Sequence, residues 1–307
     1  MRQGEVATGV ARVRVEPLGS TLGAVVSGVD LRDLSEPDWR DVLAVFHRYA
    51  VLVFPDQHLT PDEQRQFATR FGPISTPQPV GGVLPRSSQD HGAFNVANLS
   101  EAGALLDDAS HEWNKTLAGN FEWHTDSSYL PISAQASMLT AHVVPSSGGE
   151  TEWADMRSAW DSLPRTLRLR VEGRCAYHSF QYAQNRFEGA ADPGQDFRVG
   201  APLRPLVKQH AATGRSALYI GRHAFGVKGL SDQESEELLW ELHELACRPP
   251  RVLSHRWRVG DLVVWDNRAV LHRGRPWDFR ELRHLVHSRV AGNPATEGAV
   301  VPFDAAP

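Results

Sequence analysis

The chain has 307 residues, of which 41% are hydrophobic and 22% are charged, and its formal net charge is −5. These values are typical of a globular protein with one large domain or two ordinary ones, and the negative charge disfavours nucleic acid and anionic membranes as partners. Only two cysteines are present, which excludes a disulfide framework, and no stretch approaches the roughly 20 apolar residues of a membrane span. We therefore expect a cytoplasmic protein in a reducing compartment.

The N-terminal part of the sequence predicts strands followed by capped helices. Alternation at 11–15 and a β-prone run at 22–26 favour two strands. A helix is predicted to begin at Ser35, and a short buried strand is predicted at 50–54. Thr60-Pro61-Asp62-Glu63 predicts a second helix, because threonine caps it, proline suits its first position and the glutamate completes a capping box.

The middle of the chain combines long polar segments with short strands. Residues 74–111 are rich in Pro, Gly, Ser, Asp and Asn, which predicts a long loop. We interpret this loop as a lid over a functional site, with a disordered surface excursion as the alternative. Short strands are expected around Gly148-Gly149, a short helix at 155–163, and a second long excursion at 179–205.

The C-terminal third returns to strands and one helix. Strand character is present at 203–208 and 216–220, and Ser231 with Glu234 predicts another capped helix. A buried strand is predicted at 262–265. Because no repeat or change in composition marks a linker, we expect one domain over 1–307 with a core from about 11 to 292. The fold class expected is mainly β with flanking helices.

The stretch 121–129 carries the first candidate site residues, His124 and Asp126, among aromatic and β-branched residues. If this stretch is a strand, both side chains leave the same face. Among 14 histidines such a pair arises roughly once by chance, so a histidine that is merely hydrogen-bonded to a carboxylate is the alternative. We place a third ligand at His272, which would complete a two-His, one-carboxylate triad for Fe(II). The same ligands could bind Zn²⁺ in a hydrolase.

The late segment that follows His272 carries a second signal. Period-two alternation places Arg283, Leu285, His287 and Arg289 on one face of a strand. Two guanidinium groups and an imidazole on one buried face indicate a site for small carboxylates, because arginine can bind a carboxylate through two parallel hydrogen bonds. The alternative is a basic edge strand that faces solvent.

Four motifs occur in order along the chain: His124-Thr125-Asp126, Gly148-Gly149-Glu150-Thr151, Trp265-Asp266-Asn267-Arg268 with His272, and Arg283. From about residue 17 to 292 the sequence resembles the Fe(II)/2-oxoglutarate dioxygenases of the taurine and phenoxyacetate dioxygenase type. Within that family it is most similar to the aryloxyalkanoate dioxygenases, which act on phenoxypropionate and phenoxyacetate herbicides. The stretches that carry this closer similarity are 123–127, 204–208, 220–224 and 276–279.

The resemblance implies a fold and roles for particular residues. The implied fold is a double-stranded β-helix, or jelly roll, in which His124, Asp126 and His272 bind Fe(II). The resemblance also implies that Thr151 and Arg283 bind the distal carboxylate of 2-oxoglutarate. A substrate contact is implied for one further residue, Asn120.

One position departs from the family pattern. His287 stands where the taurine and phenoxyacetate enzymes carry an arginine that meets the substrate anion. A protonated His287 could still bind a carboxylate, or Arg289 on the same face could reach the substrate. His223, within Gly221-Arg222-His223-Ala224-Phe225, is a further candidate for the substrate pocket.

The sequence therefore predicts a dioxygenase that depends on Fe(II), 2-oxoglutarate and O2 and hydroxylates a C–H next to a heteroatom in a small anionic substrate. The expected substrate is an aryloxyalkanoate, cleaved to a phenol and an oxo acid while succinate and CO2 form. A taurine, alkylsulfonate or alkyl sulfate dioxygenase is the alternative within the class; a zinc-dependent hydrolase or a non-catalytic ligand sensor is the alternative outside it. We expect a homo-oligomer without nucleic acid or membrane partners.

Overall fold

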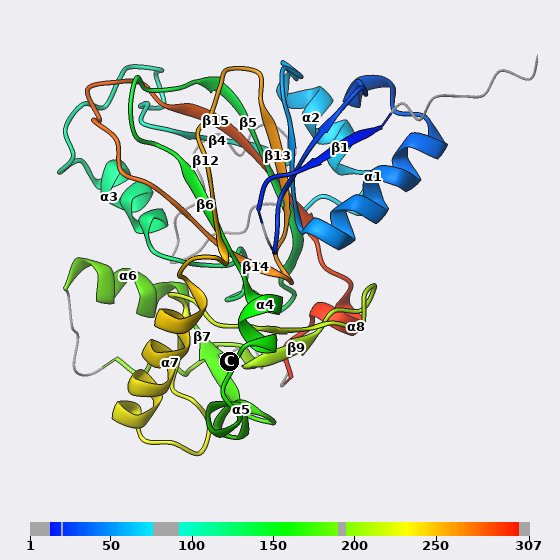
Figure 1. Cartoon of the computed structure of the whole chain (residues 1–307). Coiled ribbons are helices and arrows are strands. Elements are labelled where there is room, and N and C mark those ends of the chain that lie inside the picture. Colours follow the sequence, from blue (N-terminus) through cyan, green and yellow to red (C-terminus); the bar gives the residue numbers. More distant parts are fainter. Residues whose placement is uncertain (1–12, 20, 76–91, 190–194, 301–307) are drawn as a thin grey trace, which may run out of the picture.

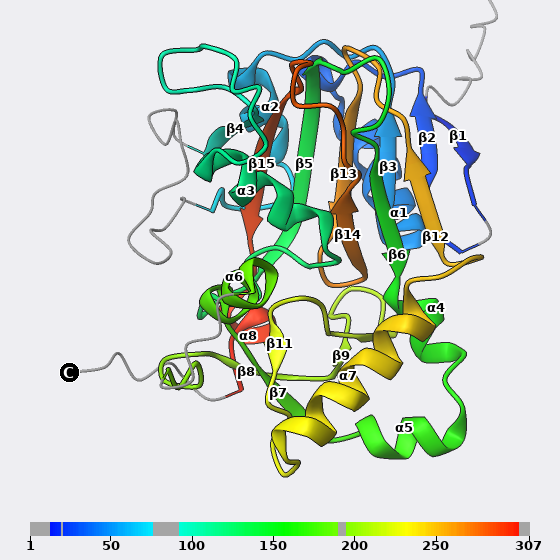
Figure 2. The ribbon, with the colours of Figure 1, turned by 90° about the vertical axis from the view of Figure 1, so that its left-hand side faces the viewer.

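A computed structural model describes residues 13–19, 21–75, 92–189 and 195–300. Much of the lid predicted at 74–111 lies outside the described residues, in the segment 76–91. Two sheets occupy the upper part of the molecule in Figure 1, and most of the helices of the central and C-terminal chain gather below them. Figure 2, turned by 90°, shows the long strands running side by side above this helical part.

The larger sheet has seven strands and contains both early and late segments of the chain. Its order is β1 (Arg14–Pro17), β2 (Ala24–Ser27), β3 (Val51–Phe54), β13 (Leu262–Asp266), β5 (Ala134–Val143), β15 (His284–Ala291) and β4 (Ala93–Ala97). All neighbours are antiparallel except the parallel pair of β2 and β3. The central strands β13 and β5 are thus each paired with another strand on both edges.

Strand β13 illustrates how the period-two pattern separates two cores. All five of its residues are buried, which explains its continuous apolar sequence. Leu262 and Val264 pack with α1 (Glu36–Tyr49) and α2 (Pro61–Ala68) on one face of the sheet. Val263 and Trp265 belong to the core on the other face.

The second sheet closes this other face. It consists of β12 (Val252–His255), β6 (Thr151–Asp155) and β14 (Val270–Gly274), all antiparallel. Its Trp153 ring meets the Trp265 ring of the larger sheet at a centroid distance of 5.8 Å, and both side chains are fully buried. In the register of β6 and β14, Trp153 lies opposite His272. The hydrophobic core between the two sheets, here called the interlayer core, therefore extends as far as the candidate site residue His272.

The remaining elements form the lower part of the molecule and the flanks of the sheets. The strands there are β7 (Cys175–His178), β8 (Leu203–Pro205) and β11 (Ala224–Phe225) in one sheet, and β9 (Val207–Gln209) with β10 (Ser216–Leu218) in another. The helices there are α4 (Met156–Asp161), α5 (Arg165–Val171), α6 (Phe180–Glu188) and α7 (Asp232–Ala246). Shorter elements are η1 (Leu31–Asp33), α3 (Glu112–Ala118), η2 (Gly119–Phe121) and α8 (Pro294–Glu297).

The structure consists of β-sheets flanked by helices in roughly equal share, and it confirms both predicted capping boxes. At α2 the Thr60 hydroxyl accepts from the Glu63 N–H at 3.3 Å, and the Glu63 carboxylate accepts from the Thr60 N–H at 2.8 Å. Ser231 and Glu234 form the same pair of bonds at α7. The chemistry of the first helical turn thus determines where these helices begin.

Two predicted irregular segments contain regular structure. Within 74–111, residues 93–97 form β4, which pairs with β15 and owes its strand conformation to that distant partner. Within 179–205, α6 begins after Ser179, whose hydroxyl accepts from the Tyr182 N–H at 3.2 Å. Only Ala183 of α6 is fully buried, so the helix contributes little to the core.

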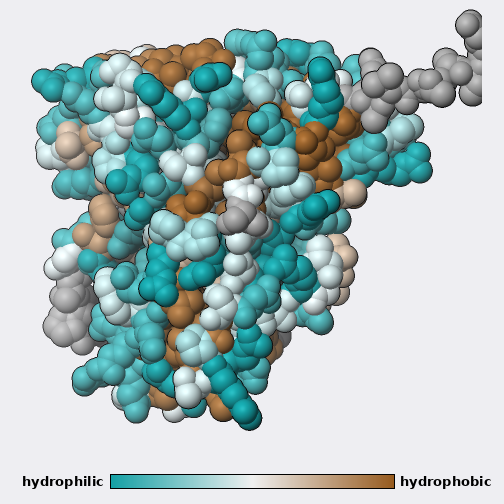
Figure 3. Space-filling view, viewed as in Figure 1, coloured by the Kyte–Doolittle hydropathy of each residue, from teal (hydrophilic) through white to brown (hydrophobic). Residues whose placement is uncertain are grey.

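In the described part of the chain, none of the helices combines the length and the apolar composition that crossing a bilayer requires. Figure 3 shows the face seen in Figure 1 covered mostly by hydrophilic side chains, with hydrophobic residues in smaller patches between them.

Candidate metal centre and its cavity

The two candidate histidines are joined through their backbones. The His124 N–H donates to the His272 carbonyl at 2.9 Å, and the His272 N–H donates to the His124 carbonyl at 2.8 Å. The stretch 121–129 is not a strand: His124 forms an isolated bridge to β14, and a turn follows in which Ser127 has a φ of 58°. The two rings lie 4.1 Å apart, between centroids.

Asp126 reaches the same place from the start of that turn. Its Oδ2 accepts a hydrogen bond from Ser137 Oγ at 2.7 Å, and its backbone N–H faces the Asn267 side-chain oxygen at 3.4 Å. The Asn267 amide in turn donates to Ser137 Oγ at 2.8 Å. Because that bond occupies a lone pair of the serine, the serine proton is directed to Asp126. The turn, and not strand alternation, brings Asp126 beside the histidines.

Candidate ligand atoms of His124, Asp126 and His272 all lie within 4.8 Å of one another, and all three side chains are buried. Among the described residues this is the one group of three such side chains that could hold a metal ion. His124 Nδ1 lies 2.8 Å from the Glu122 carbonyl, which fixes Nδ1 as the protonated nitrogen and leaves Nε2 free. His272 Nε2 lies 3.8 Å from Asp126 Oδ2.

The environment favours the protonation states that metal ligands need. Burial lowers the pKa of His124 to about 4 and the pKa of His272 well below the usual value. Burial alone would raise the pKa of Asp126, but His272, His287 and Arg289 outweigh it and hold that pKa well below the usual range. Neutral imidazoles and an ionised carboxylate result, which is the donor set of a divalent metal site.

Thr151 and Arg283 both line the cavity. Arg283 is buried, and its Nε donates to the Gly149 carbonyl at 3.1 Å. Gly149 has a φ of 70°, and a Cβ there would lie 3.0 Å from the Arg283 side chain, so the Gly-Gly turn admits the guanidinium. Burial lowers the pKa of Arg283 to about 10. Within the described residues, no carboxylate forms an ion pair with this arginine.

Strand β15 presents the face predicted from its alternation. Arg283, just before it, and His287 and Arg289 within it all line the cavity, whereas Val286 and Ser288 face α2, where Gln64 Nε2 donates to the Val286 carbonyl at 3.1 Å and to Ser288 Oγ at 3.2 Å. The solvent-facing edge strand is thereby excluded.

The cavity has a volume of about 110 Å³. Every candidate site residue except His223 lines it, and its walls also include the aromatic side chains of Phe94, Phe121, Trp265 and Trp277. Asn120 lies at its exposed rim. The polar residues therefore converge on one space bounded by aromatic rings.

His223 does not reach this space. Its ring is buried behind the metal centre, 6.1 Å from the His124 ring, and it contacts Tyr129 and Phe180. Its Nδ1 lies 3.3 Å from Ser128 Oγ. The prediction that it lines the substrate pocket finds no support in this position, and a packing role behind His124 fits the contacts.

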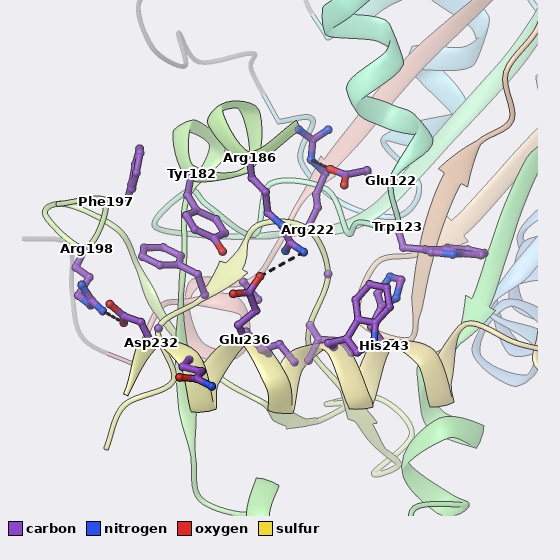
Figure 4. A pocket seen from close by; sticks show the side chains of 18 of the residues that line it. Glu122, Trp123, Tyr182, Arg186, Phe197, Arg198, Arg222, Asp232, Glu236 and His243 are labelled. Atoms are coloured by element: carbon purple, nitrogen blue, oxygen red, sulfur yellow. Dashed lines mark hydrogen bonds and ion pairs between the residues drawn. The ribbon is translucent and has the colours of Figure 1, made fainter. Parts of the chain in front are cut away.

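A larger hollow of about 660 Å³ lies between α6, α7 and the loop before β11 (Figure 4). None of the candidate site residues lines it. Its arginines are matched by carboxylates: Arg186 lies 3.9 Å from Glu236, Arg198 pairs with Asp232, and Arg222 lies 3.3 Å from Glu122. Because these charges are already neutralised, the hollow lacks the free cations that mark the smaller cavity.

Reasoning from sequence missed the residues that orient the ligands. Ser137 and Asn267 fix Asp126, and Trp257 donates from its indole N–H to Thr151 Oγ1 at 3.0 Å. Asn267 lies within the motif Trp265-Asp266-Asn267-Arg268, which gave a signal for it. Nothing local marks Ser137 or Trp257, because each meets its partner only after the sheets have formed.

Comparison with known proteins agrees with this geometry. The profile of the family described as "Taurine catabolism dioxygenase TauD, TfdA family" matches residues 14–288. The sequence is 44% identical over 294 residues to the (S)-phenoxypropionate/alpha-ketoglutarate-dioxygenase of Sphingobium herbicidovorans, covering 93% of this chain and 97% of the relative. It is 41% identical over 283 residues to the alpha-ketoglutarate-dependent 2,4-dichlorophenoxyacetate dioxygenase of Cupriavidus pinatubonensis, covering 89% and 96%.

Among solved structures, the crystal structure of AAD-2 in complex with Mn(II) and N-oxalylglycine is similar to this chain with a TM-score of 0.82 and 34% sequence identity. The match covers 94% of this chain and 99% of the other. The similarity in sequence and in fold thus extends over nearly the whole of both chains.

Proposed function

The chain belongs to the taurine catabolism dioxygenase TauD, TfdA family, and we propose that it hydroxylates the carbon next to the ether oxygen of an aryloxyalkanoic acid. It is an Fe(II)- and 2-oxoglutarate-dependent dioxygenase that uses O2. The observation that carries the proposal is a pair of arginines, Arg283 and Arg289, free of carboxylate partners among the described residues, beside a three-ligand cluster and aromatic walls. The zinc hydrolase and the ligand sensor fall outside this family.

We assign Fe(II) to His124, Asp126 and His272. The fit rests on the donor set: two neutral imidazoles and one ionised carboxylate, buried and mutually within 4.8 Å. Ser137 anchors one oxygen of Asp126, and the Glu122 carbonyl sets the tautomer of His124. Bound there, Fe(II) supplies the oxidation chemistry in which O2 and 2-oxoglutarate are consumed and succinate and CO2 are formed.

We assign the distal carboxylate of 2-oxoglutarate to Thr151 and Arg283. Both line the cavity, and the side-chain hydrogen bond that each makes with the protein involves a residue that does not line it. Arg283 keeps its two terminal nitrogens for a ligand, and the Thr151 hydroxyl keeps its proton. A buried, unpaired guanidinium is costly without an anion, which supports a carboxylate ligand beside Arg283.

The carboxylate of the substrate is assigned to Arg289. This guanidinium lines the cavity, lies over the Phe94 ring at 4.9 Å, and donates from Nη1 to Ser127 Oγ at 3.2 Å. His287 is the weaker candidate, because burial lowers its pKa and its Nε2 already faces Asp126 Oδ2 at 3.4 Å. A neutral imidazole that stacks on Trp265 and meets Phe94 edge to face shapes the cavity, and Arg289 supplies the positive charge.

The aromatic part of the substrate fits the rings that line the cavity. Phe121 and Trp277 contact each other edge to face at 5.9 Å, and Asn120 at the rim offers an amide to the ether or acid group. Hydroxylation of the carbon that bears the ether oxygen gives a hemiketal or hemiacetal, whose collapse breaks the C–O bond to release a phenol and an oxo acid. The residues of the chain act by orienting that carbon toward the metal and excluding water.

We further propose that residues 1–307 form one domain whose two sheets make up a double-stranded β-helix. The interlayer core supports this proposal, because Leu139, Leu285 and Trp265 of the larger sheet pack with Trp153 and Val270 of the smaller one. The single-domain proposal would fail if limited proteolysis released two fragments that each unfolded cooperatively.

The test of function is a side-by-side turnover assay. Purified protein with Fe(II), ascorbate and 2-oxoglutarate is offered each enantiomer of phenoxypropionate, phenoxyacetate, taurine and an alkyl sulfate, and succinate and phenol are measured. We expect phenol release from at least one aryloxyalkanoate with one succinate formed per phenol. The substrate assignment is wrong if taurine or the alkyl sulfate has the higher kcat/KM.

A further inference from the structure

Trp257 lies two residues beyond β12 and does not line the cavity itself, but it contacts Thr151, which does. Its indole N–H donates to Thr151 Oγ1 at 3.0 Å, and both side chains are buried. The register of β12 and β6 pairs His255 with Thr151, so backbone hydrogen bonds hold the tryptophan close to this hydroxyl. The contact is therefore a fixed feature of the second sheet.

This hydrogen bond decides what the Thr151 hydroxyl can do. A hydroxyl has one proton to donate, and an indole N–H can only donate. With the indole directed at the hydroxyl oxygen, the threonine proton must point to another acceptor. Within the described residues Thr151 Oγ1 has no second hydrogen-bond partner. The remaining direction is into the cavity, which Arg283 also lines.

We propose that Trp257 is a positioning residue that holds Thr151 as a hydrogen-bond donor to the distal carboxylate of 2-oxoglutarate. This inference rests on the proposed function, in which Thr151 and Arg283 bind that carboxylate. Arg283 is held in an equivalent manner, since its Nε donates to the Gly149 carbonyl and its terminal nitrogens remain for the ligand. Two neighbours outside the cavity thus orient the two groups that select a dicarboxylic cosubstrate.

The chain offers a matched control for the indole N–H. Trp153 belongs to the same interlayer core, its ring is fully buried, and its Nε1 has no hydrogen-bond partner in the described structure. Trp257→Phe and Trp153→Phe remove the same atoms from the same core. Only the first removes a donor that is in use.

The experiment is isothermal titration calorimetry of the Mn(II)-loaded protein with 2-oxoglutarate and with 2-oxopentanoate, which lacks the distal carboxylate. We expect Trp257→Phe to weaken 2-oxoglutarate about three- to tenfold, the equivalent of one hydrogen bond, and to leave 2-oxopentanoate unchanged. Trp153→Phe should change neither. Equal weakening of both ligands by Trp257→Phe would reveal a purely structural role and overturn the proposal.

A double-mutant cycle with Thr151→Val tests the role of Trp257 separately from the assignment of Thr151 to the distal carboxylate of 2-oxoglutarate. Thr151→Val should weaken 2-oxoglutarate selectively, and adding Trp257→Phe to it should cause no further loss. If Thr151→Val leaves the preference for 2-oxoglutarate intact, the assignment of Thr151 is wrong and the inference falls with it. If Thr151→Val acts and Trp257→Phe does not, the assignment stands and only the role of Trp257 is refuted.

Discussion

At the scale of single residues, Asn267 controls the carboxylate ligand without reaching the metal. Its side chain donates to Ser137 Oγ and accepts from Trp265 Nε1 at 3.0 Å, and the serine donates to Asp126. We expect Asn267→Ala to reduce the affinity for Fe(II) or Mn(II) about 10- to 100-fold, because the carboxylate loses its fixed orientation.

Metal titration of the apoprotein measures this affinity directly. The control is Asn114→Ala, which removes another buried asparagine; its amide donates to the Leu106 and Asp108 carbonyls, and none of these three residues lines the cavity. A similar loss of metal affinity in both variants would mean that general destabilisation, and not the orientation of Asp126, is responsible.

Arg289 and Arg186 are the matched pair for the substrate anion. Arg289 lines the small cavity, whereas Arg186 lines the larger hollow and faces Glu236. Arg289→Met should raise KM for phenoxypropionate about 10- to 100-fold, since a charged hydrogen bond is lost, with a small effect on KM for 2-oxoglutarate. Arg186→Met should leave both constants near their original values, and steady-state kinetics would expose a larger effect.

At the scale of elements, the capping box of α2 gives a local test of stability. Thr60→Ala removes the hydroxyl that accepts from the Glu63 N–H, and should lower the free energy of unfolding by about 1 kcal/mol. Thr116→Ala is the comparison, because that hydroxyl only donates to the Glu112 carbonyl within an exposed helical turn. Urea unfolding measures both, and equal midpoints for the two variants would contradict the expected order.

The elements that were predicted from sequence are those whose signals are local. The capped helices begin at the residues that their capping sequences predict, and the apolar run of β13 identifies a buried strand. The segment around His124 could not be predicted, because its conformation depends on a bridge to β14 and on the left-handed backbone of Ser127. The candidate site was recovered from residue type and order, whereas Ser137 and Trp257, which orient it, depend on contacts between distant strands.

Buried histidines distributed through the protein make the stability of the apoprotein depend on pH. Burial lowers the pKa of five of them: His124, His178, His223, His272 and His287. A folded pKa below the unfolded value of 6.5 means that the unfolded chain binds more protons in acid. Stability is therefore fully present above about pH 6.5 and is lost as the pH falls toward the folded values.

Each such histidine contributes up to about 1.4 kcal/mol per pH unit below 6.5. We expect the urea midpoint of the metal-free protein to fall steeply between pH 7 and pH 5. His178→Leu should reduce this dependence of stability on pH by the contribution of one proton, because both nitrogens of His178 are buried without a partner among the described residues. An unchanged slope in that variant would show that His178 titrates normally.

The bridge between His124 and His272 also has a consequence for the order of events during folding. Its neighbours Thr125 and Asn267, themselves hydrogen-bonded at 2.9 Å, are 142 positions apart in the chain. Contacts of such long sequence separation form late, because the entropy of closing the intervening chain opposes them. The ligand set is therefore absent from early folding states, and a metal ion should slow unfolding of the finished protein without accelerating its refolding. Stopped-flow kinetics with and without Mn(II) would reveal a faster refolding phase if the ion instead nucleated the fold.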